Sequence, residues 1–248
     1  MQMLMGIALE NWLRYAVVAS LAWLLAYVFF RKRWWRRKII QRDPTSADVR
    51  REMKWSVITA IVYGCVGTVT ILIGKHYGWQ MYRKIESHGW TWFVLSIVIA
   101  IVVHDTWFYW THRLMHHPRL FKVFHRVHHE STNPSPWAAY SFAPLEAFMQ
   151  ACIFPLLAFT VPMHPLAFFA FMIWQIVFNV LGHTGFEYFP SWMMRSRLGK
   201  LLNTPTNHIQ HHEKMRGNYG LYFNVWDRLM HTNHKDYEAR FNEVTSRS

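Results

Sequence analysis

The sequence predicts an all-α integral membrane protein, a helical bundle of about four to five transmembrane helices with a cytoplasmic helical cap that carries histidine boxes. Two observations lead to this fold class. The hydrophobic residues, 52% of 248, come in long blocks rather than in periodic stripes, and basic residues flank those blocks. Buried core helices of a soluble protein are the alternative, and the block pattern disfavours them.

Three apolar stretches are each long enough to cross a bilayer. They cover residues 13–30, 55–74 and 91–110, and about 20 helical residues span a hydrocarbon core of roughly 30 Å. A fourth stretch, 145–182, is longer and is interrupted at "VPMHP", whose prolines disfavour a continuous helix. We expect it to form a hairpin of two spanning or half-spanning helices.

The distribution of charge orients the chain. The segment "RKRWWRRKIIQR" after the first span carries seven Lys or Arg, whereas "KHYGWQMYRKIESHGW" after the second carries three. The first loop is therefore expected in the cytoplasm and the amino terminus outside. The net charge of +13 fits contact with an anionic leaflet. No nucleic-acid partner is expected, because the basic residues flank apolar spans and no recognised nucleic-acid motif is present.

Three regions are expected along the chain. Residues 1–90 should form the first transmembrane helices and the basic loop, 91–235 a catalytic domain, and 236–248 a frayed polar tail. Cys65 and Cys152 lie in predicted spans and are most simply small core residues. A cleaved signal peptide is not expected, since a basic n-region is missing. The ending "TSRS", without KDEL, favours a bacterial inner membrane, with the endoplasmic reticulum as the alternative.

Histidine gathers at one end of the predicted spans. In the expected topology thirteen of the sixteen histidines lie at or near the cytoplasmic face, and His76, His88 and His164 fall in outer loops. Two clusters, within residues 112–129 and 183–212, thereby reach the same side of the membrane. They must do so before they can share a metal site.

The spacing of these histidines is the sharper signal. His112 and His116 are four residues apart, which places them on one face of a helix that Pro118 should end. Two further boxes have the spacing i, i+3, i+4, which puts three imidazoles on one helical face. They consist of His125, His128 and His129, and of His208, His211 and His212.

The flanks of the last box also predict a helix. Thr204 suits the N-cap, Pro205 the first turn, and Gly217 the stop. His183 closes the preceding span in "LGHTGFE". Nine imidazoles exceed what one tetrahedral zinc can use, but they supply two metals with four or five ligands each. The sequence therefore predicts a dinuclear centre.

Ligand type alone does not choose the metal, because imidazole suits iron, zinc and copper. The lack of cysteine ligands argues against an iron–sulfur cluster and a structural zinc site. Redox chemistry with dioxygen favours iron.

Five elements together resemble the fatty acid hydroxylase and sterol desaturase superfamily of integral-membrane di-iron oxygenases, over roughly residues 95–232. They are "HDTWFYWTHRLMHH", "FHRVHHE", "GHTGFE", "NTPTNHIQHH" and "GNYGLYFNVWDRLMHT". The resemblance implies two iron ions held by His112, His116, His125, His128, His129, His183, His208, His211 and His212.

The chain departs from the family pattern at two positions. Fatty acid 2-hydroxylases carry a second histidine where Glu187 stands, so Glu187 is a carboxylate ligand, a base that acts from behind the metal ligands, or neither. Many sterol-modifying relatives have a histidine before the proline of "FAPLE", where this chain has Ala143. The second departure weakens a specifically sterol interpretation.

Asp105 and Tyr109, together with Glu187, are the candidate catalytic residues. The two lie within about 60° of His112 and His116 on a 3.6-residue helix, and an intramembrane Asp is usually functional. Asp105 is roughly 10 Å along the axis from His112. It is therefore expected either to support a histidine from another helix or to make a structural interhelical hydrogen bond.

Several other polar residues near the boxes have weaker expected roles. His104 should pack at an interface, His117 should face solvent, and His231 is a candidate tenth ligand. A further three residues are expected to anchor the cap by hydrogen bonds: Asn218, Asn224 and Asp227.

The chemistry implied by the resemblance is O2-dependent oxidation of an unactivated C–H bond in a lipid, a fatty acyl chain, an acylated lipid or a sterol. Insertion of oxygen gives an alcohol, and removal of a second hydrogen gives an alkene. Two electrons must come from an external donor, a ferredoxin or a b-type cytochrome, because the chain has no haem-attachment motif, dinucleotide fingerprint or cysteine cluster. The basic loop offers a docking surface for an acidic carrier.

Two other functions are compatible with a histidine-rich membrane protein. A zinc-dependent membrane hydrolase usually shows "HExxH", but the near-matches at Glu130 and Glu213 lack the closing histidine. A metal transporter expects ligands near the bilayer midplane, whereas these lie beyond the ends of the spans.

Overall fold

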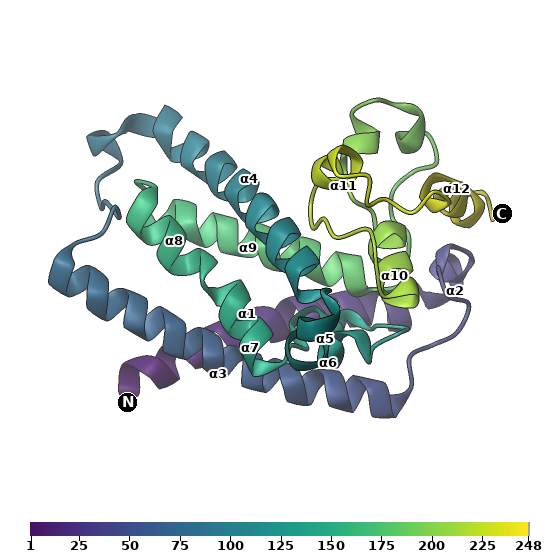
Figure 1. Ribbon diagram of the computed structural model, residues 1–248, viewed down its shortest axis with the longest axis horizontal. Coiled ribbons are helices and arrows are strands. Elements are labelled where there is room, and N and C mark those ends of the chain that lie inside the picture. The colour runs from purple at the N-terminus through teal and green to yellow at the C-terminus, as the bar shows by residue number, and fades with distance from the viewer. Residues whose placement is uncertain (248) are drawn as a thin grey trace.

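The computed structural model describes residues 1–247 and is built from helices (Figure 1). Four of them are long and apolar enough to cross a membrane: α1 (Gln2–Trp23), continued by a π-helical turn (Leu24–Phe29), α3 (Ser46–Tyr77), α4 (Gly89–Met115) and α9 (Pro165–His183). No β-strand occurs within residues 1–247. The predicted all-α membrane bundle is thus confirmed.

The fourth apolar stretch forms the expected hairpin. Its first arm consists of two short helices, α7 (Pro144–Ala151) and α8 (Ile153–Thr160), and α9 returns after residues 161–164. Pro165 occupies the first turn of α9, and the Nδ1 atom of His164 accepts a hydrogen bond from the backbone N–H of Leu166. Proline and a side-chain cap together explain why the new helix begins there.

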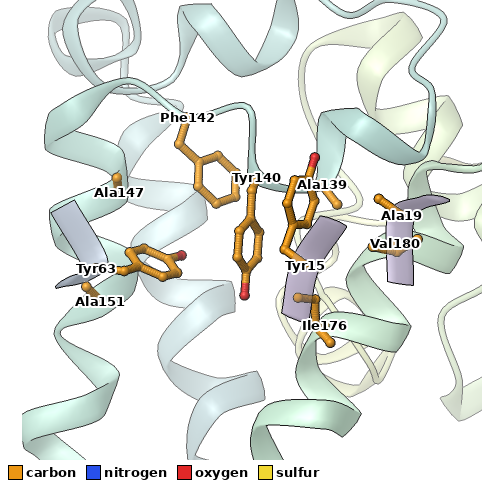
Figure 2. Packing of buried hydrophobic residues seen from close by; sticks show 10 residues of the cluster. All are labelled: Tyr15, Ala19, Tyr63, Ala139, Tyr140, Phe142, Ala147, Ala151, Ile176 and Val180. Carbon is orange, nitrogen blue, oxygen red and sulfur yellow. The ribbon is translucent and has the colours of Figure 1, made fainter. Parts of the chain in front are cut away.

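One aromatic core ties the first two long helices to the rest of the bundle (Figure 2). The rings of Tyr15 on α1 and Tyr140 stack at 4.7 Å, and Tyr63 on α3 meets Tyr140 edge-on at 5.3 Å. Tyr140 ends a 3-10 helix (Pro136–Tyr140) that follows the second histidine box. The helices before residue 90 therefore share a core with the expected catalytic region.

The remaining helices form a cap at the end of the bundle where α4 and α9 terminate (Figure 1). They are α2 (Arg31–Trp34), α5 (Pro118–Phe124), α6 (Arg126–His129), α10 (Pro205–Lys214), α11 (Val225–Leu229) and α12 (Tyr237–Ser246). Short 3-10 turns cover Trp35–Arg37, Ile85–Ser87, Met193–Arg195 and Gly199–Leu201. His76, His88 and His164 lie at the opposite end of the bundle, because they flank the loops at the other ends of α3, α4 and α9.

The expected polar tail is instead an ordered helix over most of its length, although residue 248 lies outside the described part. In α12, Tyr237, Phe241 and Val244 are buried. Their spacing of four and three residues forms an apolar stripe. Tyr237 and Phe241 pack on Met193 and Met194. The prediction was wrong because this stripe is short and lies among charged residues.

Candidate metal centre

The nine predicted histidines come together in the cap as two groups. Within each group the potential ligand atoms all lie within 4.8 Å of one another. The first group contains His112, His116, His125, His129 and His211, and the second contains His128, His183, His208 and His212. The groups adjoin, since the rings of His129 and His212 are 4.9 Å apart. All nine side chains are buried except His116, which is partly exposed.

Each box is divided between the two groups in the same way. Residues at i and i+4 share a group, as His112 and His116 do, whereas the residue at i+3 joins the other group: His128 faces the second and His211 the first. On the continuous helix α10, side chains advance about 100° per residue, so i+4 lies about 40° from i on one side and i+3 about 60° on the other. The expectation that all three imidazoles of a box share one face was therefore too coarse.

The second box does not lie on one continuous helix. α5 ends at Phe124 and α6 begins at Arg126, and His125 between them has φ −121°. This break turns the chain beneath the end of α4. His125 and His129 thereby both reach the histidines of α4.

Second partners orient the imidazoles of the first group. The Nδ1 atom of His112 lies 2.8 Å from the carbonyl oxygen of Tyr219, and that of His211 lies 2.6 Å from the carbonyl oxygen of Gly217. Because Nδ1–H donates to a carbonyl in each case, Nε2 keeps its lone pair and points into the group. His125 is oriented differently, by the carboxylate of Glu146 at 2.6 Å.

The loop that supplies these carbonyls is itself held by two aspartates. Asp227 accepts hydrogen bonds from the N–H groups of Tyr219 and Gly220 at 2.9 and 2.7 Å. Asp105 accepts from Tyr222 and Phe223 at 2.8 and 3.1 Å. These bonds fix the backbone of residues 219–223 and therefore the carbonyl that His112 uses.

The helix α10 begins as predicted and ends earlier than predicted. The side chain of Thr204 caps it and Pro205 occupies its first turn. The helix stops at Lys214 because Met215 adopts a left-handed conformation with φ 57°. Gly217, the expected stop, lies two residues beyond and also has a positive φ of 67°.

In the second group, facing Nε2 atoms lie close together. His183 donates Nδ1–H to the carbonyl of Asn179 at 2.7 Å, which leaves its Nε2 lone pair free. That atom lies 2.9 Å from Nε2 of His208 and 3.3 Å from Nε2 of His128. The Nε2 atoms of His208 and His212 are 3.2 Å apart.

Glu187 lies outside both groups and holds the start of α10. One carboxylate oxygen accepts from the N–H and hydroxyl of Thr206 at 3.0 and 2.7 Å, and the other from the N–H of Phe189. Glu187 is not among the candidate metal ligands, and its carboxylate makes no hydrogen bond with any of the nine histidines. Its hydrogen bonds position the helix that carries His208.

Asp105 and Tyr109 also have partners other than the nine histidines. Asp105 makes the structural hydrogen bonds described above, so the expected support for a histidine of another helix is not observed. Tyr109 shares a hydrogen bond with Thr232 at 3.0 Å and stacks on Trp226 of α11. Both residues fasten the C-terminal part of the cap to α4.

Burial keeps the imidazoles of the cap neutral. It lowers the pKa of His116 to about 2, with the nearby His112 adding to the effect. Desolvation, followed by neighbouring histidines, lowers the pKa values of six others well below 6.5: His125, His128, His129, His208, His211 and His212. Neutral imidazole is the form that binds a metal.

The donor set fits two transition-metal ions. A nitrogen–metal distance of about 2.0–2.1 Å places neighbouring ligand nitrogens about 2.9–3.4 Å apart, which is the range seen in the second group. In the first group the Nε2 atoms of His112 and His125 are buried without a hydrogen-bond partner, a costly arrangement unless a ligand is bound. Imidazole donors suit iron.

The other histidines near the boxes lie outside the two groups. His104 is buried and its Nδ1 is 2.8 Å from the hydroxyl of Tyr222. His117 is exposed and caps α5, and His231 is exposed with φ 54°, so neither supplies a further candidate ligand. The predicted cap anchors make hydrogen bonds within it: Asn218 to Asn207, Asn224 to Asn203, and Asp227 to the loop.

Sequence reasoning missed Glu146. Its signal was available, because it is the one charged residue of the apolar stretch 143–160, and an acid in such a place is usually functional. The carbonyls of Tyr219 and Gly217 had no comparable signal, since any residue supplies a backbone carbonyl.

The glutamates of the two near-matches to "HExxH" lie at the surface, which disfavours a hydrolase site. Glu130 lies within salt-bridge distance of Arg51 and Arg126 at the surface, and Glu213 is exposed. Among residues 1–247 neither histidine group includes an acidic side chain. A metal-bound water would therefore lack the general base that such hydrolases use.

The segment that carries the nine histidines lies within a match to a known protein family. A Fatty acid hydroxylase family model matches residues 97–232, more than half of the chain. The chain is 31% identical over 201 residues to a Delta(7)-sterol 5(6)-desaturase of Aspergillus fumigatus, covering 71% of this chain and 60% of that protein. It is 30% identical over 164 residues to a Delta(7)-sterol 5(6)-desaturase of Gibberella zeae, with coverages of 64% and 49%.

The human lathosterol oxidase is 28% identical over 188 residues, which cover 73% of this chain and 60% of that protein. The chain thus spans about half to three fifths of the length of these relatives. No solved structure matches it. The family model, with the ordered histidine boxes it covers, shows that the chain belongs to the fatty acid hydroxylase and sterol desaturase superfamily.

Proposed function

We propose that the chain is a membrane-bound di-iron oxygenase that hydroxylates or desaturates a lipid with O2 and two external electrons. The observation that carries the proposal is the convergence of nine histidines, from four segments, in two adjoining groups. Bound iron would supply the reduction of O2 in this site. The names of the relatives, which refer to sterol desaturation and lathosterol oxidation, support a lipid substrate.

Both reactions balance with the same inputs. O2 takes up four electrons, two from the external donor and two from the lipid. Hydroxylation consumes two protons and yields an alcohol and one water, whereas desaturation consumes two protons and yields an alkene and two waters. The protein itself must place one carbon near the centre and exclude bulk water.

A small apolar pocket offers a lateral route to the centre. It has a volume of about 50 Å³ and touches His208 of the second group. Its apolar lining includes Phe178 and Leu181 on the last turns of α9, together with Phe189 and Leu221. Leu181 is partly exposed on the side of the bundle. We assign the mouth of the substrate route to this position, because an apolar chain would reach it from the bilayer.

A second cavity of about 330 Å³ lies between α1, α3, α8 and α9, but its lining contains none of the nine histidines. It is therefore not favoured as the reaction site. Fatty acyl chains, acylated lipids and sterols all remain candidate substrates. Ala143, which stands where many sterol-modifying relatives have histidine, is buried at the N-cap of α7.

The cap is proposed to lie on the cytoplasmic side. The strongly basic segment after α1 packs against it, since the N–H of Ile39 donates to the carbonyl of Gly185 at 2.9 Å. A ferredoxin or b-type cytochrome would reach the centre from this side. A bacterial inner membrane is the proposed location, with the endoplasmic reticulum as the alternative.

Metal analysis and lipid mass spectrometry test the proposal together. Anaerobically purified protein should hold about two irons per chain, and lipids from cells that express it should gain one oxygen atom or lose two hydrogen atoms. His128→Ala and His211→Ala, one from each group, should abolish the lipid product and lose metal while the protein still inserts into the membrane. Full activity of either variant, or zinc as the bound metal, would contradict the proposal.

A further inference from the structure

A basic cavity lies beside the cap, apart from both histidine groups. It has a volume of about 450 Å³, and we call it the arginine pocket. Its lining consists of Arg33, Arg36, Arg37, Arg247, Trp34, Phe186, Glu187, Tyr188 and Pro190. Four arginines therefore line one cavity of the structure.

Two of these arginines are free to bind a ligand. Arg37 donates to the carbonyl of Phe189 at 2.8 Å, and Arg247 donates to Lys38 and pairs with Glu243. Arg33 and Arg36 are exposed, and within residues 1–247 neither has an acidic partner at salt-bridge distance.

The lining holds one acidic side chain, Glu187, against four arginines. Both carboxylate oxygens of Glu187 accept hydrogen bonds from Thr206 and Phe189 on the side of α10. The pocket therefore keeps a net positive charge.

The position of the pocket along the membrane normal points to lipid headgroups. α1 and its π-helical turn end at Phe29, only a few residues before Arg33. Phe29 and Phe30 are exposed, and the rings of Trp34 and Tyr188 meet edge-on at 5.3 Å in the pocket wall. Aromatic side chains of this kind mark the depth of the headgroups.

We propose that the arginine pocket binds the phosphate of an anionic lipid in the leaflet that faces the cap. Guanidinium groups form paired hydrogen bonds with phosphate oxygens, and basic pockets beside membrane helices bind phospholipid headgroups. An acidic protein is the other partner that such a basic pocket could attract, and the experiment separates it from the lipid.

Binding at this place also braces the cap. Glu187 donates its backbone N–H to the carbonyl of Arg37 at 3.0 Å, and Ile39 donates to Gly185, so the pocket rests on a short antiparallel pairing of 37–39 with 185–187. The side chain of Glu187 in turn holds the first turn of α10. A bound phosphate therefore stabilises the segment that positions the second histidine group.

Lipid binding to the full-length protein tests this site. Protein in nanodiscs of phosphatidylcholine, with or without phosphatidylglycerol, is released into detergent and examined by native mass spectrometry. The wild type should retain phosphatidylglycerol, and the lipid should raise its melting temperature by mass action. Arg33→Gln/Arg36→Gln should weaken retention about thirtyfold, from about 1 kcal/mol per arginine. The matched control, Arg50→Gln/Arg216→Gln, removes two exposed arginines elsewhere and should retain the lipid.

A third double variant tests whether binding needs the guanidinium groups themselves or only their positive charge. Arg33→Lys/Arg36→Lys keeps both charges but loses the planar fork, so it should bind less phosphatidylglycerol than the wild type. Retention equal to the wild type in this variant, or equal losses in the control, would overturn the proposal. So would binding of inorganic phosphate without binding of the lipid, or loss of electron transfer from a carrier protein with lipid binding unchanged.

Discussion

The Nδ1 atom of His125 lies 2.6 Å from Oε1 of Glu146, and both side chains are buried. This is the one carboxylate that contacts any of the nine histidines within residues 1–247. A carboxylate behind a ligating imidazole fixes its ring and makes it a stronger donor.

We therefore expect Glu146→Ala to weaken metal binding in the first group by about tenfold to a hundredfold. The measurement is iron content of the purified protein over a series of chelator concentrations. Glu146→Gln, which keeps a hydrogen-bond acceptor, should lie between Ala and the wild type. Glu130→Ala serves as the control, because Glu130 lies at the surface. Unchanged metal affinity in Glu146→Ala would show that the contact is only structural.

The division of the boxes predicts that neighbouring histidines serve different metals. His211→Ala should deplete the first group and His212→Ala the second, although the two residues are adjacent. Each variant should retain about one iron per chain, and the double variant none. Spectroscopy of the single variants should differ, because five candidate ligands surround one ion and four the other. If His211→Ala and His212→Ala gave identical mononuclear spectra, the division would be wrong.

Two variants of Asp105 distinguish a role in holding the loop from a role in catalysis. Its Oδ1 atom accepts both backbone hydrogen bonds from the loop, so Asp105→Asn can keep them, whereas Asp105→Ala leaves two buried N–H groups unpaired. We expect lipid oxidation near the wild-type rate in Asp105→Asn and a loss of stability of about 2–4 kcal/mol in Asp105→Ala. Thermal unfolding in detergent measures the second effect. An inactive but fully metal-loaded Asp105→Asn would instead identify a catalytic acid or base.

The metal-free protein should lose stability as the pH falls below about 6.5. Burial lowers the pKa of His116 to about 2 in the folded chain, while the unfolded chain protonates near 6.5. The unfolded state therefore binds more protons below that pH, and stability present above it declines as the pH falls further. Melting temperatures of metal-free protein between about pH 7.5 and 5 test this. His76→Asn, at the opposite exposed end, should not change the profile.

The lateral pocket predicts a specific defect in substrate use. Leu181→Trp places a bulky ring at the mouth of the pocket, so kcat/KM for the lipid should fall while iron content stays unchanged. Leu166→Trp is the matched control, because Leu166 is exposed at the other end of the same helix. Equal activity of the two variants would show that the lipid enters elsewhere.

Much of the fold and of the candidate centre could be predicted because the signals are local. Apolar length marks the spans, prolines mark the hairpin, and the spacing of His208, His211 and His212 marks one helix. The positive charge after the first span predicts that this segment lies at the same end as the histidines, and residue 39 does contact residue 185 there. None of these inferences needs knowledge of which segments meet.

What could not be predicted depends on contacts between distant segments. The orientation of the His112 ring is fixed by the carbonyl of Tyr219, 107 residues away. Every residue has a backbone carbonyl, so the residue type does not predict this acceptor. The role of Glu187 follows from Thr206, which meets it only after α9 and α10 have packed together. The break at His125 likewise accompanies the contacts of His125 and His129 with the histidines at the end of α4.

The loop over residues 217–223 completes the surroundings of His112 and His211 late in the order of synthesis. Its carbonyls select the tautomers of His112 and His211, so neither ring is ready until Tyr219 has been synthesised and folded back against α4. α4, which carries His112, enters the bilayer more than a hundred residues earlier in translation. A nascent chain that ends before this loop therefore holds the histidines of α4 and α6 without the carbonyl groups that orient His112 and His211.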